Sequence, residues 1–369
     1  MTYRRAIAIQ FFAISCMVAI VTLLVATTVN NLSARGIPFG LGFLFDRAGF
    51  TIAESLLSYD SDDSNAWAIA VGVGNTIYAS VITIITSTLL GTVLGIARLS
   101  SNPLVSALAR VWIETARNTP LLLLLLFVYT IWWTLPDGAG FRLVPGVHIS
   151  MRGLVVPSLA FDNGVWLFAI LALAIVAAAR PVRKWIAAIS GRAPTYAVKL
   201  FLIALFGVAL VYVSNPQIGW PTASADGIAG GLTLTPETAT ILLGLVFYTT
   251  GFVAEIVRSG IESVPRGQWE AARALGLSQG HILRRIIIPQ MMRVIVPPMT
   301  SQFINVVKNS TLAIAVGYSD FMVIMGTLIN KTSHAIEGTV IIVVVYLSIN
   351  LSISLVLNAY NRRVAITER

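Results

Sequence analysis

The sequence predicts an all-α fold, a polytopic membrane helix bundle with about eight transmembrane helices. Two observations predict this class. Of the 369 residues, 56% are hydrophobic and only 11% are charged, whereas soluble domains carry about 25% charged residues. The second observation is a series of long apolar stretches, since a helix needs about 20 apolar residues to cross the hydrocarbon of a bilayer. The lipid bilayer is therefore the expected surroundings of most of the chain.

Eight apolar stretches meet or approach the length of a span, and the fourth to sixth are short enough to need flanking residues. Each backbone N–H and C=O must find a partner inside lipid, so these stretches are predicted to be helical. The first is read as a retained span, because its uncharged run is too long for a signal peptide and no small-residue cleavage site follows. The predicted spans are 7–29, 71–97, 118–135, 164–179, 200–213, 238–254, 294–317 and 339–360.

The positions of lysine and arginine predict the orientation of these spans. With both termini in the cytoplasm, nineteen of the 25 basic residues fall in cytoplasmic segments. This is the bias expected of inner-membrane proteins. It also accounts for the net charge of +9 without nucleic acid as a partner.

Catalytic chemistry is absent from the sequence. Its three histidines, His148, His281 and His334, are far apart, and neither a metal-ligand spacing nor a phosphate-binding glycine loop occurs. We therefore expect no catalytic residue, no metal and no cofactor, and not an enzyme. An active transporter of this kind takes its energy from an ATP-binding partner or from an ion gradient.

Polar residues inside the predicted spans are few. Lys308 lies midway through the seventh span, where a charge costs roughly 2.5–3.5 kcal/mol. We expect it to face the bundle interior or a wet cavity beside Asn305, Asn309 and Ser310. Two roles for Lys308 remain as alternatives: hydrogen bonding between helices, and contact with the substrate path or its gate. Glu255 and Arg258 are expected to form an ion pair one helical turn apart.

The cytoplasmic loop 258–293 has the most informative pattern. Residues 268–275 predict a short helix that Gly276 ends. Ser278 is placed to cap a second helix ending before Pro289. Trp269 is predicted to be exposed on the first helix, and a protein partner covering it is the physical explanation.

This loop resembles the ABC-importer permease family. Glu270-Ala271-Ala272, Gly276, Ile286, Ile288 and Pro289 match the pattern EAA-x3-G-x9-I-x-L-P, with isoleucine for leucine at 288. The resemblance implies an ATPase-coupling loop that docks in a groove of a separate ATP-hydrolysing subunit, which binds the ATP. The coupling residues it implies are Gly267, Gln268, Trp269, Glu270, Ala271, Ala272, Gly276 and Pro289.

Three further segments narrow the resemblance to the polar amino acid uptake permeases. They are residues 255–258, 117–122 and 308–312, which read EIVR, RNTPLL and KNSTL. Two extra spans in the insertion 137–235 make the chain most similar to the larger permeases of general L-amino-acid importers. The implied organisation is 1–66, first span and periplasmic loop; 67–136, first half of the permease core; 137–235, the insertion; and 236–369, second half of the permease core with the coupling loop.

The resemblance implies import of amino acids by alternating access across a bacterial inner membrane. The implied partners are ABC ATPase subunits, a second permease in a heterodimer and a periplasmic amino-acid-binding protein. A gradient-driven secondary amino acid transporter is the alternative, and the scarcity of acidic residues within the spans speaks against it. The identity of the amino acids carried is not encoded in any motif of this sequence.

Overall fold

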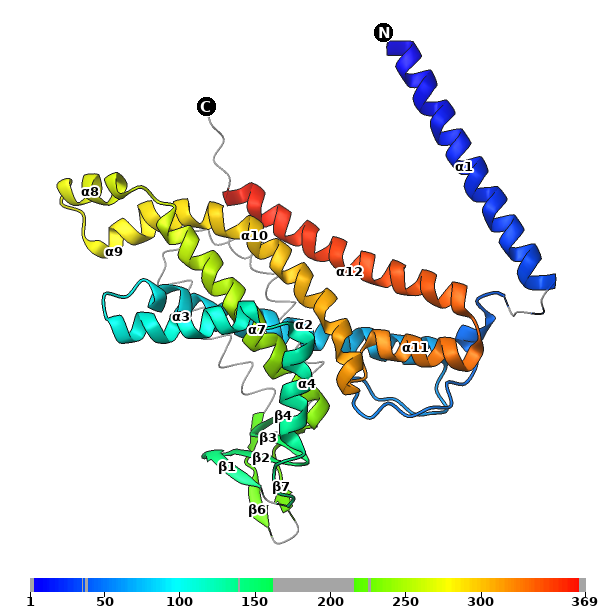
Figure 1. Cartoon of the computed structure of the whole chain (residues 1–369), viewed down its shortest axis with the longest axis horizontal. Coiled ribbons are helices and arrows are strands. Elements are labelled where there is room, and N and C mark those ends of the chain that lie inside the picture. Colours follow the sequence, from blue (N-terminus) through cyan, green and yellow to red (C-terminus); the bar gives the residue numbers. More distant parts are fainter. Residues whose placement is uncertain are drawn as a thin grey trace, which may run out of the picture. The chain divides into compact units, whose positions relative to one another are not determined.

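The computed structural model describes residues 3–34, 36, 39–138, 140–161, 216–224 and 227–364 (Figure 1). The chain divides into two compact units, Met1–Val128 with Thr240–Arg369, and Tyr129–Ala239. The first unit is helical, although α4 runs on into the second unit and α7 begins there. The helices are α1 Tyr3–Ala34, η1 Gly42–Phe45, α2 Asn65–Arg98, α3 Pro103–Asn118, α4 Leu121–Trp132, α7 Pro236–Glu262, α8 Arg266–Ala274, α9 Gln279–Ile282, η2 Leu283–Ile287, α10 Ile288–Asn309, η3 Ser310–Val316, α11 Phe321–Thr332 and α12 Ala335–Val364.

Between four and six membrane spans occur among the described residues. Helices α1, α2, α7 and α12 are each long and apolar enough to cross a bilayer, and they correspond to the predicted first, second, sixth and eighth spans. Two bent helix pairs add up to two more: α3 with α4, at 106°, and Gln279–Val316 with α11, at 56°. The predicted spans 164–179 and 200–213 lie outside the described residues.

The predicted extent of the third span, 118–135, is wrong. Asn118 ends α3, and α4 begins only at Leu121 and has 12 residues. Between them Thr119 is extended, with ψ 124°, because the residue before a proline, here Pro120, is sterically excluded from helical geometry.

The seventh predicted span, 294–317, also differs from the structure in where it begins and in its helix type near the end. Helix α10 starts earlier, at Ile288, and passes through Pro297 and Pro298 without interruption. Beyond it η3 is a 3₁₀ helix that ends at Val316, and its C-cap, Gly317, has a left-handed φ of +81°. Helix α11, which the apolar stretches did not predict, follows with Asp320 as its N-cap, accepting a hydrogen bond from Val323 N.

Close helix contacts hold the first unit together at glycines. A Cβ at Gly91 would lie 2.6 Å from Val253 Cβ, and one at Gly95 would lie 2.6 Å from the carbonyl oxygen of Ala254. Small residues at this spacing allow two helix backbones to approach. The G-x-x-x-G of α2 is therefore the surface on which α7 packs.

A second group of contacts ties the loop between α1 and α2 to the unit. Ala48 from this loop and Ala68 from α2 are buried in one cluster with Phe321, Ile324 and Leu328 of α11. The Lys331 ammonium donates a hydrogen bond to the carbonyl oxygen of Ala48. The loop is therefore integral to the folded unit.

The second unit contradicts the all-α prediction. Its described residues form a four-stranded antiparallel sheet in the order β1-β2-β3-β8 and two two-stranded antiparallel sheets, β4-β5 and β6-β7. Hydropathy did not reveal these strands, because each has only three or four residues. Two of the pairs, β3-β8 and β4-β5, also join residues on opposite sides of 162–215. The strands are β1 Phe141–Val144, β2 Val147–Ser150, β3 Gly153–Val156, β4 Ser158–Phe161, β5 Pro216–Gly219, β6 Thr222–Ser224, β7 Gly227–Ala229 and β8 Leu232–Leu234.

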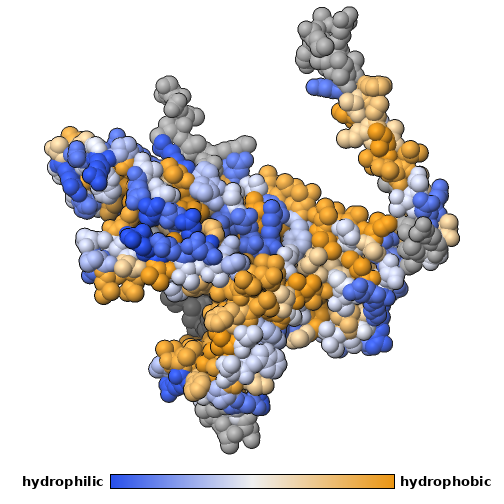
Figure 2. Space-filling view, in the orientation of Figure 1, coloured by the Kyte–Doolittle hydropathy of each residue, from blue (hydrophilic) through white to orange (hydrophobic). Residues whose placement is uncertain are grey.

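Hydropathy is unevenly distributed over the helical unit. Figure 2 shows hydrophilic residues gathered over α8, α9 and the start of α10, and apolar residues over α11 and α12. In α12 the side chains of Val340, Val343 and Leu347 are each more than half exposed. Such a surface is stable against lipid or another apolar helix and not against water.

Candidate functional site

The loop helix α8 has a well-defined C-terminus. Gly276 N donates to Arg273 O at 2.9 Å, and Leu277 N donates to Ala272 O at 3.3 Å. These two bonds form a Schellman motif, which places the intervening residue in the left-handed region. Gly276 has φ +69° there. The prediction that the helix ends at Gly276 is therefore confirmed, and the cause is the left-handed backbone of this residue.

The second loop helix differs from its prediction. Ser278 is the N-cap of α9, but its hydroxyl lies 2.8 Å from His281 Nδ1 and makes no cap bond. The helix does not end before Pro289. Five residues of π-helix, η2, lead directly into α10 and leave Pro289 in the first turn of that helix. A proline costs little there because the first-turn N–H groups have no intrahelical partner.

The inner face of the loop is a small apolar core. Val264, Ala272, Ile282 and Ile287 are buried together, and Trp269 packs against them. The prediction that Trp269 is exposed is therefore wrong. Its indole is half-buried because the turn at Gly276 folds α9 and η2 back onto that side of α8.

The outer face of the loop is formed by other residues of the predicted coupling set. Gly267, Gln268, Glu270, Ala271 and Gly276 are exposed. At the tip, Leu275 is 77% exposed and Leu277 is 39% exposed. The amide of Gln290 lies 3.5 Å from that of Gln268, and so connects α8 to α10.

An ion network lies near the end of α7. Arg258 binds Glu255 through two nitrogens, at 3.1 and 2.5 Å, and Glu262 at 2.5 Å. The predicted ion pair is confirmed. The structure adds Arg117 from the last turn of α3, 3.8 Å from Glu255, with its guanidinium over the Phe252 ring. The network joins α3 to α7 just before the coupling loop.

The four candidate substrate-path residues do not converge. Ser310 is fully buried and donates to Val307 O at 2.8 Å, and Asn309 is half-buried. Asn305 and Lys308 lie one turn apart on α10 and are both exposed. Lys308 has no ion-pair partner among the described residues, so the expectation that it faces the bundle interior or a wet cavity stays a prediction.

Metal chemistry finds no support in the described residues. Nowhere among them do three His, Cys, Asp or Glu side chains gather as ion ligands. The geometry therefore consists of a compact two-helix loop, an ion network and exposed polar positions on a membrane helix.

Comparison with known proteins decides the family. Residues 87–366 match the family model "Binding-protein-dependent transport system inner membrane component". The chain belongs to this family. As such a component it is an inner-membrane protein that crosses the bilayer several times, works with a binding protein and is not itself an enzyme. Membership favours an ABC importer permease over a gradient-driven transporter.

Three curated relatives match over almost the full length of this permease. It is 39% identical over 99% of its length to the general L-amino acid transport system permease protein AapQ of Rhizobium johnstonii, covering 93% of that protein. It is 39% identical over 99% to the putative amino-acid ABC transporter permease protein YhdX of Escherichia coli, covering 95%. It is 35% identical over 99% to the glutamate/glutamine/aspartate/asparagine transport system permease protein BztB of Rhodobacter capsulatus, covering 95%.

A solved structure described as an amino acid ABC transporter with histidines has a TM-score of 0.48 and 19% identity to the permease. The match covers 81% of this chain and 94% of that one.

Proposed function

We propose that this permease is a transmembrane subunit of an ATP-binding-cassette importer for general or polar L-amino acids. The names of the three full-length relatives supply the substrate class. The observation that carries the coupling role is the loop tip. It consists of α8, capped by a Schellman motif, with Leu275 exposed on a compact apolar base.

In this proposal ATP is bound and hydrolysed by separate ATPase subunits, which dock on the exposed face around Glu270 and Leu275. Force passes through the loop core into η2 and then into α10, because η2 runs into α10 without a break. A rigid loop is needed, because a flexible one would absorb a small displacement. The spans then alternate between two packed arrangements, inward-open and outward-open.

A second permease subunit, forming a heterodimer with this one, accounts for the exposed polar face of α10. A lysine facing lipid near the bilayer centre costs roughly 2.5–3.5 kcal/mol. A partner helix or a wet path covering Lys308 and Asn305 removes that cost. Asn309 and Ser310 continue the same segment, and we assign all four to the substrate path or its gate. Replacing Lys308 with leucine should then change uptake or its substrate range.

The proposed topology has eight spans with both termini in the cytoplasm, which places the coupling loop on the cytoplasmic side. The periplasmic binding protein delivers the amino acid to the opposite side. The segments 1–66, 67–136, 137–235 and 236–369 retain the roles assigned above, with the β-strands belonging to the insertion.

The test is uptake of labelled L-glutamate into proteoliposomes that contain the permease pair, its ATPase and its binding protein. Two variants at Gly276 isolate the coupling helix. Gly276→Val strains the left-handed backbone by about 1–2 kcal/mol, whereas Gly276→Asn tolerates that conformation. We expect the valine variant to hydrolyse ATP without matching uptake and the asparagine variant to remain coupled. Equal coupling in both variants, or uptake driven by an ion gradient without ATP, contradicts the proposal.

A further inference from the structure

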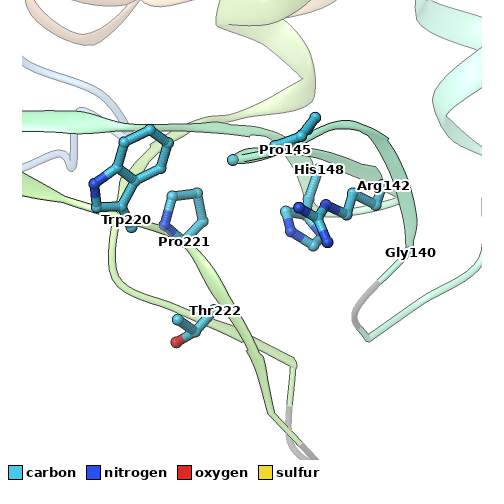
Figure 3. A pocket seen from close by; sticks show the side chains of 8 residues that line it. Gly140, Arg142, Pro145, His148, Trp220, Pro221 and Thr222 are labelled. Atoms are coloured by element: carbon cyan, nitrogen blue, oxygen red, sulfur yellow. The ribbon is translucent and has the colours of Figure 1, made fainter.

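A cavity of about 560 Å³ lies entirely within the strand-rich second unit (Figure 3). It is lined by Gly140, Arg142, Pro145, Gly146, His148, Trp220, Pro221 and Thr222. The volume is within the range of small-molecule sites. None of these residues belongs to the coupling loop or the proposed substrate path.

One wall carries the cationic group. Arg142 on β1 and His148 on β2 are direct cross-strand partners, so their side chains leave the same face of the hairpin. Figure 3 shows them side by side. Arg142 is exposed and has no ion-pair or hydrogen-bond partner among the described residues. By contrast Arg152, in the same unit, donates to Asp137 at 2.8 Å.

The imidazole beside Arg142 is buried, at 7% exposure. Its Nδ1 has no hydrogen-bond partner in the stretches of chain that the structure describes. Buried polar atoms in native proteins are almost always paired. Within the described part of the chain, the unpaired ring nitrogen and the neighbouring guanidinium therefore form a polar wall that is open to a ligand.

The opposite wall is flat and apolar. Trp220 and Pro221 face the hairpin across the cavity in Figure 3. A Cβ at Gly146 would come within 2.7 Å of the Trp220 ring. The indole is therefore held over the turn between β1 and β2, yet it remains 57% exposed. A large aromatic surface left open to solvent beside a cation suits a ligand with both an anionic and an apolar group.

We propose that this cavity binds a free small carboxylate that carries a planar or apolar group. Its carboxylate is held by Arg142, whose planar fork matches two carboxylate oxygens. The apolar group lies against Trp220 and Pro221. His148 borders the carboxylate and orients it. Its lining residues are not among those assigned to the substrate path, and the proposal does not depend on which amino acids are carried.

The test is titration of the intact transporter complex in nanodiscs with phenylacetate and with phenylacetamide, its uncharged isostere. Binding is followed by calorimetry and by tryptophan fluorescence. We expect saturable binding of phenylacetate, at least tenfold weaker binding of the amide, and at least tenfold weaker binding of phenylacetate to Arg142→Gln. Arg152→Gln is the matched control and should bind as wild type. Trp220→Phe should remove the fluorescence response.

Three results overturn the proposal: equal binding of acid and amide, wild-type binding by Arg142→Gln, or equal loss in Arg152→Gln. ATP-driven uptake by the same variants shows that the complex is folded. Normal uptake by a complex that binds no phenylacetate contradicts the carboxylate site and leaves the proposed transport function unaffected. If Arg142→Gln instead weakens only the association with the binding protein, the cavity is a protein-docking surface and the small-ligand site is wrong.

Discussion

The exposed tip of the coupling loop makes a quantitative prediction. Leu275→Ala should weaken docking of the ATPase subunit without unfolding the permease. The leucine is 77% exposed in the chain alone, so nearly all of its side chain is available for burial by a partner. Full burial of a leucine contributes about 1.5–3 kcal/mol. Allowing for the methyl group that remains, the change should cost about 1–2 kcal/mol, or roughly 5- to 30-fold in Kd.

The assay is titration of the purified ATPase into nanodiscs that contain the permease pair, with ATPase stimulation measured on the same samples. Leu41→Ala is the control, since Leu41 is also exposed, at 57%, but lies in the loop between α1 and α2. Trp269→Ala should instead destabilise the loop itself, because it removes a side chain packed in the loop core. The loop should then unfold at a lower temperature. An unchanged Kd for Leu275→Ala, or the same loss in Leu41→Ala, would refute docking at this tip.

Three other predictions follow from packing and charge. Gly95→Leu should separate α2 from α7 and destabilise the permease by about 1–3 kcal/mol, whereas Gly74→Ala in the same helix meets only an ordinary contact at 3.7 Å; equal melting temperatures would contradict this. Glu255→Gln should lower thermal stability by removing the carboxylate that pairs with Arg117 and leaving Arg258 with Glu262 as its acidic partner, and no change in melting would show that the network is inert. The bond from Arg152 holds the pKa of Asp137 below its ordinary 3.8. Its stabilisation is therefore complete above the unfolded pKa and is lost as pH falls through the folded one; carboxyl NMR should show the pKa rising in Arg152→Gln.

The coupling loop shows how much of the candidate site could be predicted. The helix ending at Gly276 follows from local chain geometry, and the structure reproduces it. The direction in which α8 faces does not follow. Trp269 and Leu275 are both apolar residues of the predicted helix, yet the first packs inward and the second is exposed. Only the fold-back of α9 and η2 decides between them.

Lys308 illustrates the same limit within the bilayer. Its position in an apolar helix predicted that the charge must be covered, which is a matter of solvation. Which surface covers it depends on how α10 packs, and α10 turns Lys308 away from its own chain. Likewise, only the packing of α7 shows which helix lies against Gly91 and Gly95 of α2.

By itself the sequence determined the membrane class, the long spans, the capped coupling helix and the ion pair at Glu255. Each of these rests on hydropathy or on residues within about two helical turns. Only the tertiary structure decided the position of α11, the π-helical turn before Pro289 and the strands of the second unit. The cavity between Arg142 and Trp220 belongs with these, since its walls are almost eighty residues apart in the chain. Contacts between distant segments depend on how whole elements pack, and no local pattern encodes that packing.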